Sequence, residues 1–160
     1  MKGCQKVIDA LNQLLVDELA ARDQYFIHSS MLFEWELDSM ATRIAHEMEE
    51  ETDHARQLIK RILFLEGTPE MTPSKINVGK DVPDIIDKDL KLELTVVKNL
   101  RKTIALCEHE LDFVSRDILL GLLKDTEEDH THWLERQQRL INMVGLQNYI
   151  QSQMKEGGLE

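Results

Sequence analysis

Apolar residues recur at alternating steps of three and four along most of the chain, which is the period of an amphipathic helix. Proline breaks such a helix, and all three prolines fall within residues 69–83, close to Gly67 and Gly79. The pattern predicts one long connection near the middle of the chain, with a helical hairpin on each side. We expect a single all-α domain over residues 1–160, with four long helices and a short fifth. The expected helices are 5–34, 39–66, 83–110, 113–144 and 146–154.

The two hairpins are expected to pack together as a four-helix bundle. A long connection between helices two and three can run the length of the bundle, so these two helices are predicted to be parallel. Asp38 or Ser39 is expected to cap the second helix and Asp112 the fourth, because their side chains can accept hydrogen bonds from free amides. Gly145 is expected to end the fourth helix.

Each long helix has one glutamate at a position of its apolar stripe where a core residue is expected. These four are Glu18, Glu51, Glu93 and Glu127. The second and fourth each open a Glu-x-x-His motif, which ends at His54 and at His130. Residues three apart lie on the same face of a helix, one turn apart. Nearly the same number of residues separates the two glutamates within each hairpin, so the chain is interpreted as a duplicated hairpin.

Carboxylates at core positions point to bound metal. Burying an isolated carboxylate costs several kcal/mol, and two divalent cations shared among four carboxylates and two imidazoles would offset that cost. One Glu from each of two helices and Glu-x-x-His from each of the others is the ligand set of dinuclear carboxylate bundles. Oxygen and imidazole donors suit iron or manganese, and the pattern lacks the thiolates of a structural zinc site.

Four further residues lie near the proposed ligands along the helices. Glu47 lies one turn before Glu51, and Tyr25 lies two turns after Glu18, so both are predicted to form hydrogen bonds to ligands. His46 and Glu50 form an i, i+4 pair that is expected to face away from the ligands. That pair is interpreted either as a surface pair or as a secondary iron site.

Charge and composition narrow the classes of partner. The formal net charge is −11, which disfavours nucleic acid and anionic membranes as partners. No apolar run is long enough to span a bilayer. The two cysteines, Cys4 and Cys107, are far apart in the sequence and suggest no disulfide framework. We therefore expect a soluble protein of the reducing cytoplasm.

With these motifs the chain resembles the ferritin superfamily and, more narrowly, the bacterioferritins. The resemblance extends nearly from end to end and is carried by residues 23–26, 61–67, 98–101, 114–117 and 145–149. It implies a ferroxidase, which oxidises Fe(II) with dioxygen or hydrogen peroxide. It also implies a hollow shell of 24 subunits that stores Fe(III) as a mineral.

The resemblance also implies a role for each ligand. The six positions that match are Glu18, Glu51, His54, Glu93, Glu127 and His130. In this assignment the two glutamates of the Glu-x-x-His motifs bridge the irons. Glu18 with His54 completes one iron, and Glu93 with His130 completes the other.

The resemblance also has implications for haem binding and for a pore formed by the fifth helix. Bacterioferritins ligate haem b through a methionine directly after the bridging glutamate of helix two, and here that position is Thr52. The chain resembles the subunit type that lacks this ligand, so a homopolymer is not expected to hold haem. Such a subunit forms its own shell or assembles with a methionine-bearing partner. By resemblance, Asn148 and Gln151 of the fifth helix line a four-fold pore.

Two alternatives stay open at this point. One is a dinuclear iron oxidase or peroxidase without storage, and the other is a helical interaction module without activity. A ferredoxin-type protein is the expected electron donor if stored iron is released by reduction. The sequence does not decide between oxygen and peroxide, or between an iron pair that stays as a cofactor and iron in transit.

Overall fold

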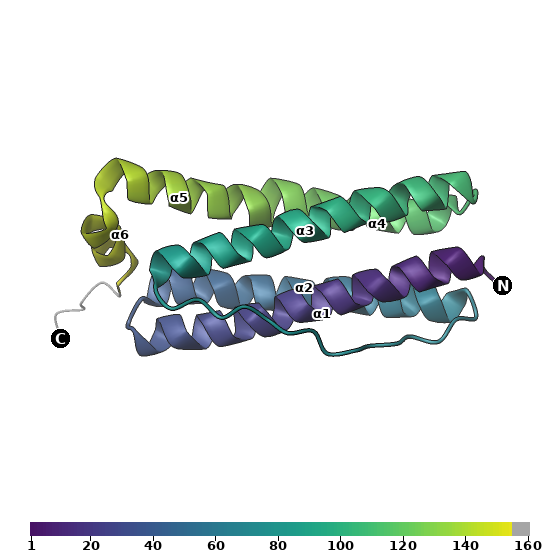
Figure 1. Ribbon diagram of the computed structural model, residues 1–160, viewed down its shortest axis with the longest axis horizontal. Helices are drawn as coiled ribbons and strands as arrows, with labels where there is room; N and C mark the ends of the chain where they lie inside the picture. The colour runs from purple at the N-terminus through teal and green to yellow at the C-terminus, as the bar shows by residue number, and fades with distance from the viewer. Residues whose placement is uncertain (155–160) are drawn as a thin grey trace.

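A computed structural model describes residues 1–154, and this part of the chain contains helices and no strand. The elements are α1 (Gln5–Glu34), α2 (Asp38–Phe64), α3 (Val82–His109), α4 (Phe113–Asp125), η1 (Thr126–Thr131), α5 (His132–Val144) and α6 (Leu146–Gln153). The segment α4–η1–α5 forms one long rod, so four rods pack side by side with α6 at one end (Figure 1). The predicted all-α bundle with a short C-terminal helix is confirmed.

The long connection, residues 65–81, returns along the outside of the bundle before α3 begins (Figure 1). Helices α2 and α3 therefore run in the same direction, as predicted. One prediction about the helix starts is confirmed and one is wrong. Asp112 caps α4, since its carboxylate accepts a hydrogen bond from the Ser115 amide at 3.0 Å. Leu37, rather than Asp38 or Ser39, holds the cap position of α2, and no side chain caps that helix.

Local turn geometry explains the difference at α2. Glu36 has a positive φ of 60°, and the Leu37 amide donates back to the Leu32 carbonyl at 3.0 Å. These bonds close the end of α1 in a Schellman motif and bury Leu37. The chain enters α2 directly from this turn, so a buried apolar residue occupies the place where a polar cap was expected.

The core consists of two apolar clusters with a polar layer between them. One cluster lies toward the N-terminal end of α1 and contains Leu11, Leu58, Leu100 and Leu119. The other lies toward the C-terminal end of α1 and contains Ala21, Ile44, Ile86 and Leu134. Each rod passes from one cluster to the other at mid-length, and there it contributes buried carboxylate or imidazole groups.

A buried polar clamp fastens the connection to the bundle. His28 Nδ1 lies 2.8 Å from Asp89 Oδ1, and the Gly79 amide donates to His28 Nε2 at 2.9 Å. Because that amide can only donate, the ring proton must lie on Nδ1, facing Asp89. Gln24 donates to the same carboxylate at 2.8 Å and accepts from the Asn77 amide at 3.0 Å. The clamp ties the connection to α1 and α3.

None of the helices in residues 1–154 is both long enough and apolar enough to span a membrane.

Candidate metal centre

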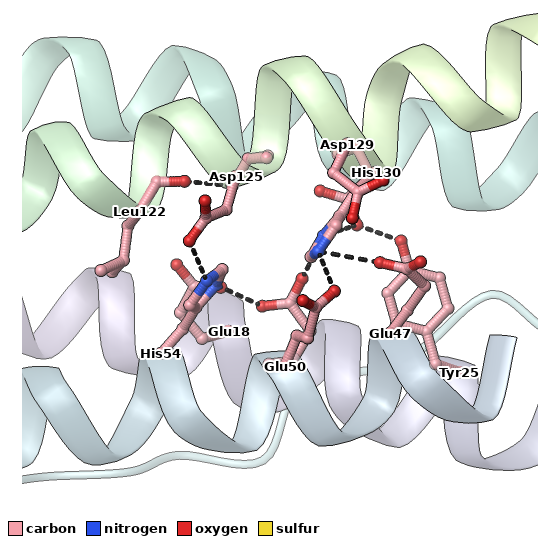
Figure 2. A network of polar contacts seen from close by, with 12 residues as sticks. Glu18, Tyr25, Glu47, Glu50, His54, Leu122, Asp125, Asp129 and His130 are labelled. Carbon is pink, nitrogen blue, oxygen red and sulfur yellow. Dashed lines mark hydrogen bonds and ion pairs between the residues drawn. The ribbon is translucent and has the colours of Figure 1, made fainter. Parts of the chain in front are cut away.

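The polar layer brings five of the six predicted ligands together. Glu18 comes from α1, Glu51 and His54 from α2, Glu93 from α3 and His130 from η1. Each has at most 3% of its surface exposed, in a layer between the two apolar clusters. Figure 2 shows the two imidazoles facing carboxylates of the neighbouring helices.

The first ligand group contains Glu18, Glu51 and His54, whose ligand atoms all lie within 4.8 Å of one another. His54 Nδ1 lies 3.2 Å from Glu51 Oε2 and 3.7 Å from Glu18 Oε2. On the other side of the ring, Nε2 lies 3.5 Å from Asp125 Oδ2. One nitrogen of the ring therefore faces the centre while the other meets an outer carboxylate.

The second ligand group contains Glu51, Glu93 and His130, again within 4.8 Å. His130 Nδ1 lies 3.0 Å from Glu51 Oε1 and 3.5 Å from Glu93 Oε1. Glu51 thus presents one oxygen to each histidine, as a bridging carboxylate must. The two imidazole rings stack with centroids 5.8 Å apart, so the two groups lie side by side.

The donor set fits a pair of metal ions. Both oxygens of Glu18 and Oε2 of Glu93 are buried and accept no hydrogen bond. A buried carboxylate oxygen without a partner is costly, and bound cations would satisfy these oxygens. The donors are at least four carboxylate oxygens and two imidazoles, a set that suits iron or manganese.

Three ligands of the centre have raised pKa values, so they hold protons at a higher pH than isolated side chains do. Burial, together with the nearby charge of Glu51, raises the pKa of Glu18 well above its usual range. Burial raises the pKa of Glu93 to about 7. Burial alone would lower the pKa of His54, but contacts with Glu18 and Glu51 outweigh it and raise that pKa to about 11. Metal ions must displace these protons in order to bind.

Glu127 is the predicted ligand that the structure does not bring into the centre. Its Oε1 lies 2.5 Å from Arg101 Nη2 on α3, and its side chain is 36% exposed. The reason is the π-helical segment η1, which contains both Glu127 and His130. A π-turn holds more residues than an α-turn, so two residues three apart lie at a wider angle around the helix axis than they would in an α-helix.

Of the four residues expected near the ligands, three contact a ligand directly and His46 does not. The Tyr25 hydroxyl donates a hydrogen bond to Glu93 Oε1, and Glu47 Oε2 lies 2.8 Å from His130 Nε2. The expectation that Glu50 faces away from the ligands is wrong, because its Oε2 lies 3.1 Å from the same His130 nitrogen. His46 is mostly exposed and lies 3.6 Å from Glu50 Oε1.

A third ligand group borders the centre, and it combines Glu50 with residues other than His46, the partner considered from the sequence. It contains Glu47, Glu50, Asp129 and His130, within 4.8 Å of one another. Arg43 lies against it, with Nη2 at 2.6 Å from both Glu47 Oε1 and Asp129 Oδ1. The acidic residues within 125–129 were the only sequence feature that could have indicated Asp125 and Asp129. No sequence pattern indicates that Arg43 of α2 would contact Asp129.

The haem and pore positions lie outside the polar layer. The Thr52 hydroxyl is half-buried and donates to the Met48 carbonyl at 2.9 Å. Asn148 and Gln151 are exposed on α6. That helix is anchored by the buried Tyr149, whose hydroxyl donates to Gln137 at 3.0 Å.

A four-helix bundle whose core holds paired Glu and His ligands defines the class of dinuclear metal carboxylate proteins. The family model of the Ferritin-like domain matches residues 8–144. The chain belongs to the ferritin family.

Three relatives illustrate how similar this chain is to known members. A bacterial ferritin of Pseudomonas aeruginosa is 58% identical over 154 residues, which cover 96% of this chain and 100% of the relative. A bacterial ferritin of Synechocystis is 55% identical over 96% of this chain and 99% of the relative. A bacterioferritin of Brucella melitensis is 37% identical over 94% of each chain.

Proposed function

We propose that this protein is a ferroxidase that stores iron: it oxidises Fe(II) at the buried centre and keeps Fe(III) as a mineral inside a 24-subunit shell. One observation carries the proposal. Glu51 presents one oxygen to each of two buried ligand groups, and each group adds one further glutamate and one histidine. The names of the relatives, bacterial ferritin and bacterioferritin, support storage as the purpose of the oxidation.

The residues divide the work at this centre. Glu18 with His54 would bind one Fe(II) and Glu93 with His130 the other, with Glu51 between them. The iron pair supplies two electrons together to dioxygen or peroxide. Anionic oxygen donors favour Fe(III) over Fe(II), because the higher charge gains more from them. The Tyr25 hydroxyl holds Glu93 in place, and the apolar clusters on both sides exclude bulk water.

Aerobic addition of Fe(II) to the purified protein tests the proposal. We expect rapid appearance of Fe(III) absorbance, with the iron eluting in a particle far larger than the 18.6 kDa chain. Rapid oxidation without retained iron would favour the oxidase or peroxidase alternative. If the protein neither oxidises Fe(II) rapidly nor retains iron, the remaining alternative is a helical bundle without this activity.

We expect shells built only of this chain to lack haem, because a threonine hydroxyl is a poor replacement for the thioether that ligates haem iron. Thr52→Met should introduce a strong Soret band in protein purified from haem-replete cells. Thr42→Met, at an exposed position of the same helix, is the matched control and should stay colourless. A Soret band with low-spin bis-methionine features in the parent homopolymer would contradict this expectation.

Glu127 is proposed to join the centre when metal binds. Its ion pair with Arg101 is partly exposed, and such pairs contribute at most about 1 kcal/mol, so a metal ion can outcompete the guanidinium. Glu127→Gln should therefore slow Fe(II) oxidation by at least about 10-fold, which is the lower end of the effect of losing a group that only supports a ligand. Arg101→Gln, which frees the carboxylate, should not slow it. Unchanged stopped-flow rates in Glu127→Gln would show that this carboxylate stays outside the centre.

A further inference from the structure

Arg43 occupies the position of a cation in the third ligand group. One guanidinium nitrogen, Nη2, lies 2.6 Å from a carboxylate oxygen of Glu47 on its own helix and 2.6 Å from one of Asp129 on η1. The two carboxylates belong to the four residues whose ligand atoms gather within 4.8 Å. A single positively charged group thus bridges two carboxylates, as a metal ion would.

Other contacts hold the guanidinium there. The Arg43 guanidinium carbon lies 5.6 Å from the centroid of the Trp133 ring, which adds a cation–π contact from α5. Its side chain is 25% exposed, so the charge is partly shielded from water. Arg43 therefore has a carboxylate partner on α2, a second on η1 and an aromatic face on α5.

Glu47 is the member of the third ligand group whose buried oxygens are available to coordinate a metal ion. Its side chain is 2% exposed, and both of its oxygens lack a hydrogen bond of good geometry. Their close neighbours are the two cationic groups, Arg43 at 2.6 Å and His130 Nε2 at 2.8 Å. Removing one of those cations would leave this buried carboxylate undercompensated beside Glu50 and Asp129, and a metal ion in its place would offset the charge.

His130 cannot coordinate a metal ion in the third ligand group while it coordinates one in the dinuclear centre. A neutral imidazole has one free lone pair, and Nδ1 faces Glu51 and Glu93. If Nδ1 holds a metal ion, Nε2 carries the proton and can only donate to Glu47 or Glu50. The third group is then a site of carboxylate oxygens alone, which suits a hard divalent cation such as Mn²⁺.

We propose that Arg43 closes a third metal site, formed by Glu47, Glu50 and Asp129, beside the dinuclear centre. The inference rests on the proposed function only in that the dinuclear centre binds metal. Removing the charge of Arg43 opens the third site to one further divalent cation.

Counting bound Mn²⁺ tests this role without any turnover. Free Mn²⁺ is measured by its EPR signal after equilibrium dialysis against the assembled protein. Arg43→Gln should bind one more ion per subunit than the parent. Arg136→Gln removes the same charge at an exposed position of α5 and should bind as many ions as the parent. Adding Glu47→Gln to Arg43→Gln should abolish the extra ion.

Two results would overturn the role of Arg43. In the first, Arg43→Gln binds the same number of ions as the parent while its helical content is retained. In the second, the extra ion survives the addition of Glu47→Gln. Arg43→Met removes the charge but keeps an unbranched side chain, and it serves as a second variant if the glutamine variant does not fold. Failure of the parent itself to bind Mn²⁺ would overturn the proposed function, whereas the count in Arg43→Gln relative to the parent addresses Arg43.

Discussion

Replacing Glu51 with glutamine is expected to abolish the fast phase of Fe(II) oxidation. Glu51 belongs to both ligand groups of the dinuclear centre, so its loss removes a donor from each metal ion at once. Residues that only hydrogen-bond to a metal ligand are worth about 10–100-fold, and a shared ligand should exceed that range. The initial rate of Fe(III) formation in stopped-flow absorbance gives the measurement.

Glu49→Gln is the matched control, because Glu49 lies two residues away on the exposed face of α2. It makes the same change of charge and should oxidise Fe(II) at the parental rate. Both variants should assemble as the parent does, since neither disturbs the apolar clusters. A normal initial rate in Glu51→Gln would rule out the dinuclear centre as the site of oxidation.

The metal-free protein is expected to lose stability as the pH rises from about 4.5 to about 7. Glu93 has its pKa raised by burial from 4.5 to about 7, so in this range the folded chain binds a proton that the unfolded chain has released. Stability therefore falls with rising pH, and this shift alone corresponds to about 3 kcal/mol. Thermal unfolding of the metal-free protein across this range measures the effect.

Two other groups of the centre titrate mainly outside this pH range. The pKa of His54 is raised to about 11 by its carboxylate contacts against the effect of burial, so its contribution is lost as the pH rises further. Burial would raise the pKa of Glu51, but contacts with Glu18 and His130 outweigh it and lower that pKa, which affects stability only under more acidic conditions. Neither group opposes the fall between about pH 4.5 and about pH 7.

Metal ions should reverse the trend, because they replace the protons. The gain in melting temperature on adding Mn²⁺ is expected to increase from about pH 5 to about pH 8. Glu93→Gln carries no titratable group at this position, so the stability of its metal-free form should fall less than that of the parent, and Glu18, whose pKa burial also raises, accounts for the remaining fall. A metal-free parent that becomes more stable between about pH 4.5 and about pH 7 would contradict the assignment of Glu93.

The helices and the polar layer could be predicted from the sequence because both depend on local geometry. Apolar steps of three and four define one face of a helix, so the positions of Glu18 and Glu93 within that face follow directly. Glu51 and His54 share one α-helical turn, and the structure brings them together as expected. The duplicated pattern put these residues at matching heights, since both hairpins have nearly the same length.

The tertiary structure decided the features that depend on contacts between helices or on a departure from the α-helix. The π-turn of η1 directs Glu127 to Arg101 while His130 stays in the core, and a Glu-x-x-His motif does not reveal this. The meeting of Arg43 with Asp129 joins residues far apart in the chain, and it depends on how α2 packs against η1. A periodic pattern specifies which face of a helix is buried, but the partner across the interface is set by packing and register, which only the folded bundle determines.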